Sequence, residues 1–104
     1  MNSRRSLYDV SSYYNKKAVL KASYEGMRYQ IQQIEREEEK RLLVTVWPEP
    51  FGFDKTPDEK KEQQDFPYNE EGLDTAYEWL CRIYEEQREL WEHARDFPMD
   101  GILF

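Results

Sequence analysis

The sequence predicts an α+β domain in which a meander of three or four antiparallel strands packs against one long C-terminal helix. Two patterns predict this fold. Apolar and polar residues alternate along residues 17–24, 27–32 and 42–47, which is the period of a half-buried strand. Along residues 69–96 apolar residues recur instead at intervals of three and four, which is the period of an amphipathic helix.

The first two segments are expected to form a β-hairpin. Leu20, Ala22 and Tyr24 would share one side of the first strand, and residues 27–31 alternate in the same way after the turn at Glu25-Gly26. On propensity alone, the residues before Glu25 also suit a helix, and that alternative stays open.

Residues 42–47 form the clearest strand, because β-branched side chains dominate them. Pro48 and Pro50 end the strand, since proline cannot donate a ladder hydrogen bond. The charged run at residues 35–41 is expected to be a solvated turn before this strand. A short edge strand is expected around residues 63–68.

One continuous helix is expected over residues 69–96. Asn69 is a good N-cap, and the acids that follow it suit the positive end of the helix dipole. At 1.5 Å per residue such a rod would span about 40 Å, which is longer than a four-stranded sheet is wide. Leu90 and Trp91 near its end would then need cover from the tail or a second subunit. The apolar stripe that seals the sheet is Leu73, Tyr77, Leu80 and Tyr84.

The chain is expected to form a single domain at residues 16–104, preceded by a flexible N-terminal arm at residues 1–15. No apolar segment approaches the ~20 residues that a membrane-spanning helix needs, and no apolar stretch follows Arg4 and Arg5 as in a secretory signal. The single cysteine, Cys81, excludes an intramolecular disulfide. These features predict a cytoplasmic protein without a membrane partner.

No catalytic or metal-binding residue is expected. The single histidine, His93, and Cys81 lie on the same predicted helix, about 18 Å apart along its axis, which is too far for a Cys-His pair. A zinc site needs about four ligands, and these two are the only soft ligands in the sequence. The glycines are isolated, so no phosphate-binding glycine loop is present. We therefore expect a non-enzymatic protein without a cofactor.

The sequence favours an interaction or accessory domain that associates with itself, as a homodimer through the helix and exposed aromatic residues, or with another protein. Trp79 lies beside the centre of the helical stripe, and Trp47 lies on the opposite side of its strand from Val44 and Val46. Aromatic side chains away from the core are enriched at interfaces. The candidate interface residues are Trp47, Trp79, Leu90, Trp91 and Phe104.

The uneven charge supports a second hypothesis, a single-stranded nucleic-acid-binding protein. The net charge of the chain is −7, yet residues 1–34 carry a net charge of +4. The order of strands followed by one long helix over residues 17–96 is similar to that of the β4–α single-strand-binding transcriptional coactivators, and this resemblance implies dimerisation through the helix. The acidic total counts against the hypothesis, because phosphate contacts supply most non-specific affinity. Lys17, Lys21 and Arg28 of the hairpin, with Arg4 and Arg5 of the arm, would make the contacts.

A third hypothesis is an acidic inhibitor that imitates nucleic acid. Residues 70–96 carry a net charge of −6, and a row of carboxylates along the helix would display it. A solvated helix face has the same composition, so this pattern alone does not separate the two. The row consists of Glu78, Glu85, Glu89, Glu92 and Asp96.

Overall fold

A computed structural model describes residues 2–11, 13–48, 56 and 58–96. In these residues four strands form one antiparallel sheet in the order of the chain, so the predicted meander is confirmed. The strands are β1 (Leu20–Tyr24), β2 (Met27–Arg36), β3 (Glu39–Pro48) and β4 (Glu62–Pro67).

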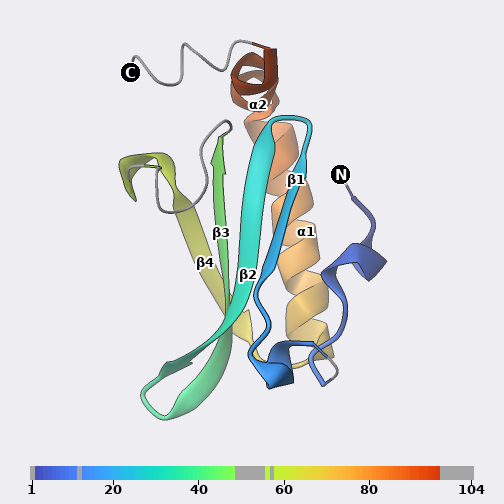
Figure 1. Cartoon of the computed structure of the whole chain (residues 1–104), viewed down its shortest axis with the longest axis vertical. Helices are drawn as coiled ribbons and strands as arrows, with labels where there is room; N and C mark the ends of the chain where they lie inside the picture. Colours follow the sequence, from blue (N-terminus) through green and yellow to red (C-terminus); the bar gives the residue numbers. More distant parts are fainter. Residues whose placement is uncertain (1, 12, 49–55, 57, 97–104) are drawn as a thin grey trace.

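The helices follow the sheet along the chain. Figure 1 shows α1 lying along one face of the sheet and α2 turning over its upper end. This arrangement confirms the predicted α+β class. Short 3-10 turns precede β1 and β4. The remaining elements are α1 (Glu70–Glu86), α2 (Arg88–Asp96), η1 (Arg4–Leu7), η2 (Tyr14–Lys16) and η4 (Asp58–Lys60).

Two tight turns set the register of the first three strands. Glu25 and Gly26 join β1 to β2 with φ angles of 47° and 95°. Glu37 and Glu38 join β2 to β3 with φ angles of 50° and 68°. Two-residue loops with positive φ at both positions match the right-handed twist of the strands they connect. The charged run at residues 35–41 is therefore not one solvated turn, as the sequence suggested, because the strands continue until these two residues.

The core lies between α1 and one face of the sheet, which we call the inner face. Tyr29, Ile31 and Val44 from the sheet are buried there, and so are Leu73 and Leu80 from the helix. Burying a large apolar side chain contributes about 1.5–3 kcal/mol. The strands contribute every second residue to this core, and α1 contributes residues three and four apart. Tyr84 of the predicted stripe is also buried, whereas Tyr77 is half-buried.

The segment predicted as a flexible arm contributes two residues to this core. Leu7 and Tyr14 are both fully buried, and the Tyr14 hydroxyl donates a hydrogen bond of 2.8 Å to the carbonyl oxygen of Leu7. Arg4 pairs with Asp74 of α1, with 2.6 Å between Nε and Oδ1. The described part of the arm is therefore attached to the domain, and the boundary at residue 15 stays a prediction.

The start of α1 agrees with the predicted cap. Oδ1 of Asn69 accepts a hydrogen bond of 2.6 Å from the backbone N–H of Gly72, which satisfies one of the free donors of the first turn. The first turn also carries Glu70 and Glu71, as the helix dipole favours.

The prediction of one continuous helix was wrong at Gln87. That residue has φ −117° and ψ 26°, so the helix ends at Glu86 and α2 begins at Arg88. The break turns Trp91 inward, where its indole N–H donates a hydrogen bond of 3.3 Å to the carbonyl oxygen of Ile83. A straight rod would have carried Trp91 past the sheet, whereas the bent one buries it to 1% exposure.

The bend also brings α2 onto the turn between β1 and β2. A Cβ atom added at Gly26 would lie 1.9 Å from the carbonyl oxygen of Trp91. The guanidinium of Arg95 pairs with the carboxylate of Glu25 in the same turn. Gly26 thus meets two demands, a positive φ and close contact with the helix backbone.

We predict that Gly26→Ala lowers the free energy of unfolding by about 2 kcal/mol or more, because the new Cβ meets the Trp91 carbonyl and alanine disfavours positive φ. Glu38→Gly is the matched control at the second turn. It should raise the free energy of unfolding by up to about 1 kcal/mol, since glycine relieves a left-handed glutamate. Urea denaturation measures both, and equal losses in the two variants would contradict the assignment.

We predict that Tyr14→Phe lowers the free energy of unfolding by about 1 kcal/mol, because the Leu7 carbonyl loses its donor. Burial raises the pKa of Tyr14 in the folded protein, while an unfolded tyrosine titrates near 10. The unfolded state therefore binds fewer protons above about pH 10, and the stability of the wild type falls there. Tyr14→Phe should flatten this fall in denaturation curves recorded against pH.

The matched control is Tyr8→Phe, because Tyr8 is exposed and stacks on Tyr13 outside the core. It should change the free energy of unfolding at pH 7 by less than about 0.5 kcal/mol. An equally steep alkaline fall in Tyr14→Phe would show that other groups cause it.

Candidate interaction surface

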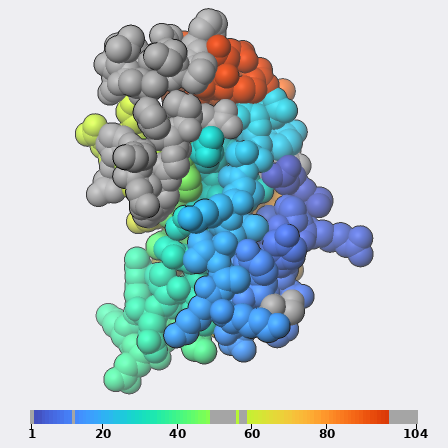
Figure 2. Space-filling model, in the orientation of Figure 1, coloured from blue at the N-terminus to red at the C-terminus, as the bar shows by residue number. Residues whose placement is uncertain are grey.

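The sheet has a second face, turned away from α1, which we call the outer face. Figure 2 shows it in front, formed by β1, β2 and the β2–β3 hairpin, with α1 almost hidden behind. Because side chains alternate along a strand, the register assigns its members. They are Lys21, Ser23, Arg28, Gln30, Gln32, Ile34, Arg36, Glu39, Arg41, Leu43, Thr45, Trp47, Gln63, Asp65 and Pro67.

A polar row crosses the middle of the outer face. Lys21, Gln30, Thr45 and Gln63 are consecutive partners across the four strands. The Gln63 amide donates a hydrogen bond of 3.1 Å to the hydroxyl of Thr45. Such cross-strand bonds on one face fix the register of neighbouring strands.

Part of the predicted nucleic-acid surface falls on this face. Lys21 and Arg28 lie on it, and Lys17 lies at its edge, just before β1. Among the described residues, Nε of Arg28 is buried without a hydrogen-bond partner. Arg4 does not join them, because it pairs with Asp74 on α1, and Arg5 lies beside it, exposed, in η1.

The predicted interface residues do not gather on one surface. Trp47 lies on the outer face but is only 4% exposed, and Trp91 is buried. Trp79 is half-buried, with its ring centroid 6.0 Å from that of Phe66. Phe104 lies outside the described residues. Of the five, Leu90 alone is an exposed apolar side chain in the described part of the chain, at 47%.

Ion pairs balance part of the charge on the outer face. Asp65 of β4 lies 3.1 Å from Nε of Arg41 and 3.6 Å from a terminal nitrogen of Arg36. Sequence reasoning missed this cluster, since it placed both arginines in a turn. The register of two strands is needed to bring them together, and no local signal gives that register.

The carboxylate row on the helices is interrupted by arginines. Glu92 accepts a hydrogen bond of 3.1 Å from Arg88. The hydrogen bond from Arg95 lowers the pKa of Asp96. Glu78, Glu85 and Glu89 are exposed on either side of the break at Gln87. The row is therefore neither straight nor uniformly free to imitate a phosphate backbone.

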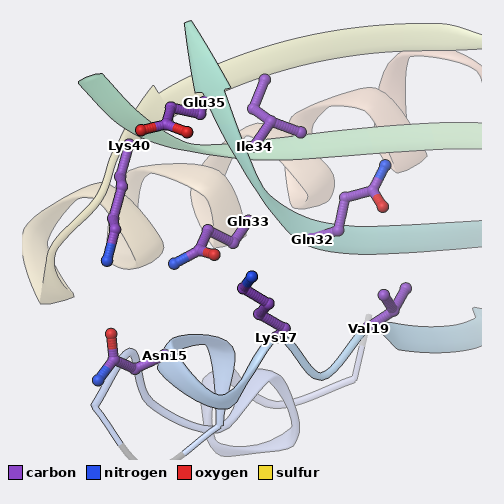
Figure 3. Close-up of a pocket in the computed structure, with 8 residues that line it drawn as sticks. All are labelled: Asn15, Lys17, Val19, Gln32, Gln33, Ile34, Glu35 and Lys40. Carbon is purple, nitrogen blue, oxygen red and sulfur yellow. The ribbon is translucent and has the colours of Figure 1, made fainter. Parts of the chain in front are cut away.

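A hollow of about 520 Å³ opens beside the end of β1, and no sequence pattern indicated it. Figure 3 shows it between β2 and the segment that leads from η2 into β1. The hollow exists because β1 begins only at Leu20, opposite Ile31, and among the described strands leaves the rest of β2 unpaired on that side. The alternation of apolar residues does not reveal where β1 begins. The hollow is lined by Asn15, Lys17, Val19, Gln32, Gln33, Ile34, Glu35 and Lys40.

Potential reactive groups lie apart from this hollow. Cys81 is half-buried on α1 beside Tyr77, and burial, followed by a hydrogen bond with Cys81, raises the pKa of Tyr77. His93 lies exposed on α2. Within the residues that the structure covers, no group of three or more histidine, cysteine, aspartate or glutamate side chains could hold a metal ion.

The described helices include none that is both long and apolar enough to cross a membrane. No family model, curated protein or solved structure matches this chain.

Proposed function

We propose that this chain is a non-catalytic interaction domain of the cytoplasm that self-associates as a dimer through the outer face of its sheet. The supporting observation is a group of half-buried apolar side chains on the outer face, Ile34 and Leu43, next to the buried Thr45. The inner face is sealed by α1, whereas the outer face combines apolar side chains with ion-paired ones. A second layer of the same pleat can pack on the part of this face where Ile34 and Leu43 are only half-buried.

Partly exposed apolar side chains supply the driving force for this dimer. Leu43 lies at the centre of the outer face, with Gln32 and Asp65 as its cross-strand partners, and it is only half-buried. Ile34 is half-buried beside it, and Val19 at the edge is 39% exposed. Covering these side chains gains about 25 cal/mol for each Å² of apolar surface removed from water.

Charge favours the outer face over the helices as the dimer interface. Residues 70–96 carry a net charge of −6, so two copies of this layer would repel each other. The outer face carries both signs, and Arg36, Arg41 and Asp65 already pair within it. A second copy can therefore approach this face without a large like-charge cost, unlike in the helix-mediated dimer that the sequence suggested.

Single-stranded nucleic-acid binding is the second candidate. Its support is the placement of Lys21 and Arg28 on one face of the sheet. Gln30 is the cross-strand partner of Lys21, and Gln32 follows on the same face of β2. Single-strand binders combine such a surface with exposed aromatic rings on which bases stack. Trp47, the aromatic residue of the outer face, is only 4% exposed, so self-association is the better supported proposal.

We predict that multi-angle light scattering gives a mass of twice 12.7 kDa for the wild type, and that Leu43→Asp reduces it to 12.7 kDa by placing a charge at the centre of the interface. Leu90→Asp is the matched control, since Leu90 is exposed on α2 and away from the outer face. It should leave the dimer intact. A wild type that stays at 12.7 kDa up to about 1 mM, or a dimer lost only in Leu90→Asp, would rule out this interface.

A further inference from the structure

β1 leaves the last part of β2 without a partner on one side. The two strands pair from Met27 to Ile31 of β2, and β1 begins at Leu20, opposite Ile31. β2 continues to Arg36, paired with β3 alone among the described strands. Residues 32–36 are therefore an edge of the sheet, although β2 is a central strand over the rest of its length.

The two turns decide which backbone groups face this edge. In antiparallel hairpins with two-residue loops, the residues that flank the loop exchange both backbone hydrogen bonds. Tyr24 and Met27 flank one loop, and Arg36 and Glu39 flank the other. By alternation, odd-numbered residues of β2 direct their N–H and C=O toward the β1 side. Gln33 and Glu35 therefore present two donors and two acceptors to the free edge.

Hydrogen bonds at the edge of β1 that faces away from β2 agree with this alternation of backbone groups. The Val19 carbonyl accepts from the Tyr13 hydroxyl at 3.2 Å, and the Ser23 carbonyl accepts from the Asn2 amide at 3.1 Å. The arm therefore covers the edge of the sheet at β1. In the described residues it does not pair with the exposed edge at Gln33 and Glu35.

The hollow lies directly against this exposed edge. Figure 3 shows the side chains of Lys17 and Lys40 pointing into it from opposite sides, with Gln33 between them and Asn15 below Lys40. A hydrogen bond of 3.5 Å from the Tyr68 hydroxyl to Asn15 Oδ1 lies beside the hollow. The Lys40 ammonium lies 5.7 Å from the centre of the Tyr68 ring. The site is thus built from four segments of the chain.

The two lysines of the hollow favour a ligand that carries one acidic side chain. Lys17 and Lys40 form no ion pair in the part of the chain that the structure describes, and Glu35 is the one carboxylate in the lining. Glu37 and Glu38 occupy the nearby turn and would repel further acids. Lys17 is held with φ 62°, a conformation in which glycine or asparagine is favoured over lysine.

We propose that the exposed edge of β2 binds an extended peptide as an added strand, with one acidic side chain held between Lys17 and Lys40. Peptide addition at a sheet edge gains affinity from main-chain hydrogen bonds and specificity from side-chain contacts. The backbone groups of Gln33 and Glu35 supply the main-chain hydrogen bonds, and Lys17 and Lys40 supply the side-chain contacts. The hollow shares Val19 and Ile34 with the proposed dimer interface, but the backbone groups of Gln33 and Glu35 face the free edge of β2, so peptide binding does not require self-association.

A peptide fits this site better than a single-stranded nucleic acid does. Alternating N–H donors and C=O acceptors match another peptide backbone, whereas a phosphodiester offers acceptors only. None of the eight lining residues is aromatic, and the nearby Tyr68 ring already contacts the Lys40 ammonium, so the lining itself offers no ring for base stacking.

The experiment is an NMR titration of the labelled full-length chain with the peptide Val-Thr-Val-Glu-Val-Thr-Val. We expect the largest amide shifts and new protection from hydrogen exchange at Gln33 and Glu35. The same peptide with lysine in place of glutamate should bind about tenfold more weakly. A single-stranded oligothymidylate is titrated in parallel.

Variants connect binding to the proposed contacts. Lys17→Glu combined with Lys40→Glu should weaken the peptide by about tenfold or more. Lys21→Glu is the matched control, because Lys21 is exposed but does not line the hollow. Glu35→Pro removes an edge N–H without removing a bond to β3, and should abolish the protection, whereas Glu35→Ala should retain it. Amide dispersion in each spectrum confirms folding.

The outcomes separate this proposal from self-association. Leu43→Asp, tested as a monomer, should bind the peptide at least as tightly as the wild type does, because the dimer would cover Val19 and Ile34 of the hollow. Absence of shifts at Gln33 and Glu35 up to about 1 mM peptide would overturn the proposal, whatever the oligomeric state. Equal binding of the glutamate and lysine peptides would overturn its charge selection. Lysine-dependent binding of oligothymidylate without peptide binding would assign the hollow to nucleic acid instead.

Discussion

The contact between α1 and the inner face of the sheet is the constraint on which the rest of the structure depends. A strand buries every second residue and a helix about one residue in three or four, so each element alone leaves its apolar side in water. Leu73 and Leu80 of α1 meet Tyr29, Ile31 and Val44 across this layer, and all are buried. α1 covers the inner face, whereas the outer face carries mixed polar and apolar side chains, of which Thr45 and Trp47 are buried.

The length of the C-terminal segment explains the bend at Gln87. A straight continuation of α1 would leave Trp91 beyond the sheet, with a large apolar ring in water. The bend costs regular helical geometry at one residue and buries that ring, which then donates to the Ile83 carbonyl. It also explains a glycine at Gly26, since the β1–β2 turn now touches the backbone of α2.

Sequence reasoning predicted the elements that local patterns encode. Alternation placed β1, β2 and β3, and Asn69 marked the start of α1 through the cap that the structure contains. It did not predict the bend at Gln87, because periods of three and four continue through that residue. The burial of Tyr14 was also missed, since its partner Leu7 lies in an aperiodic segment and the contact is tertiary.

The candidate sites follow less directly from the sequence than the fold does. Lys21 and Arg28 were predicted to share a face, and strand alternation was enough for that. The exposed edge at Gln33 and Glu35 arises because β1 is shorter than β2, and strand length depends on where the preceding chain leaves the sheet. Lys17 and Lys40 point into the hollow from opposite sides, although they belong to different segments of the chain.

α1 holds the sheet as one cooperative unit, and Leu80→Ala tests this directly. Leu80 is fully buried at the centre of the contact. We expect the free energy of unfolding to fall by about 2–5 kcal/mol, with helix circular dichroism and tryptophan fluorescence following one coincident transition. A loss below about 0.5 kcal/mol, or strands whose backbone amide NMR signals stay native after the helix has melted, would contradict this role of α1.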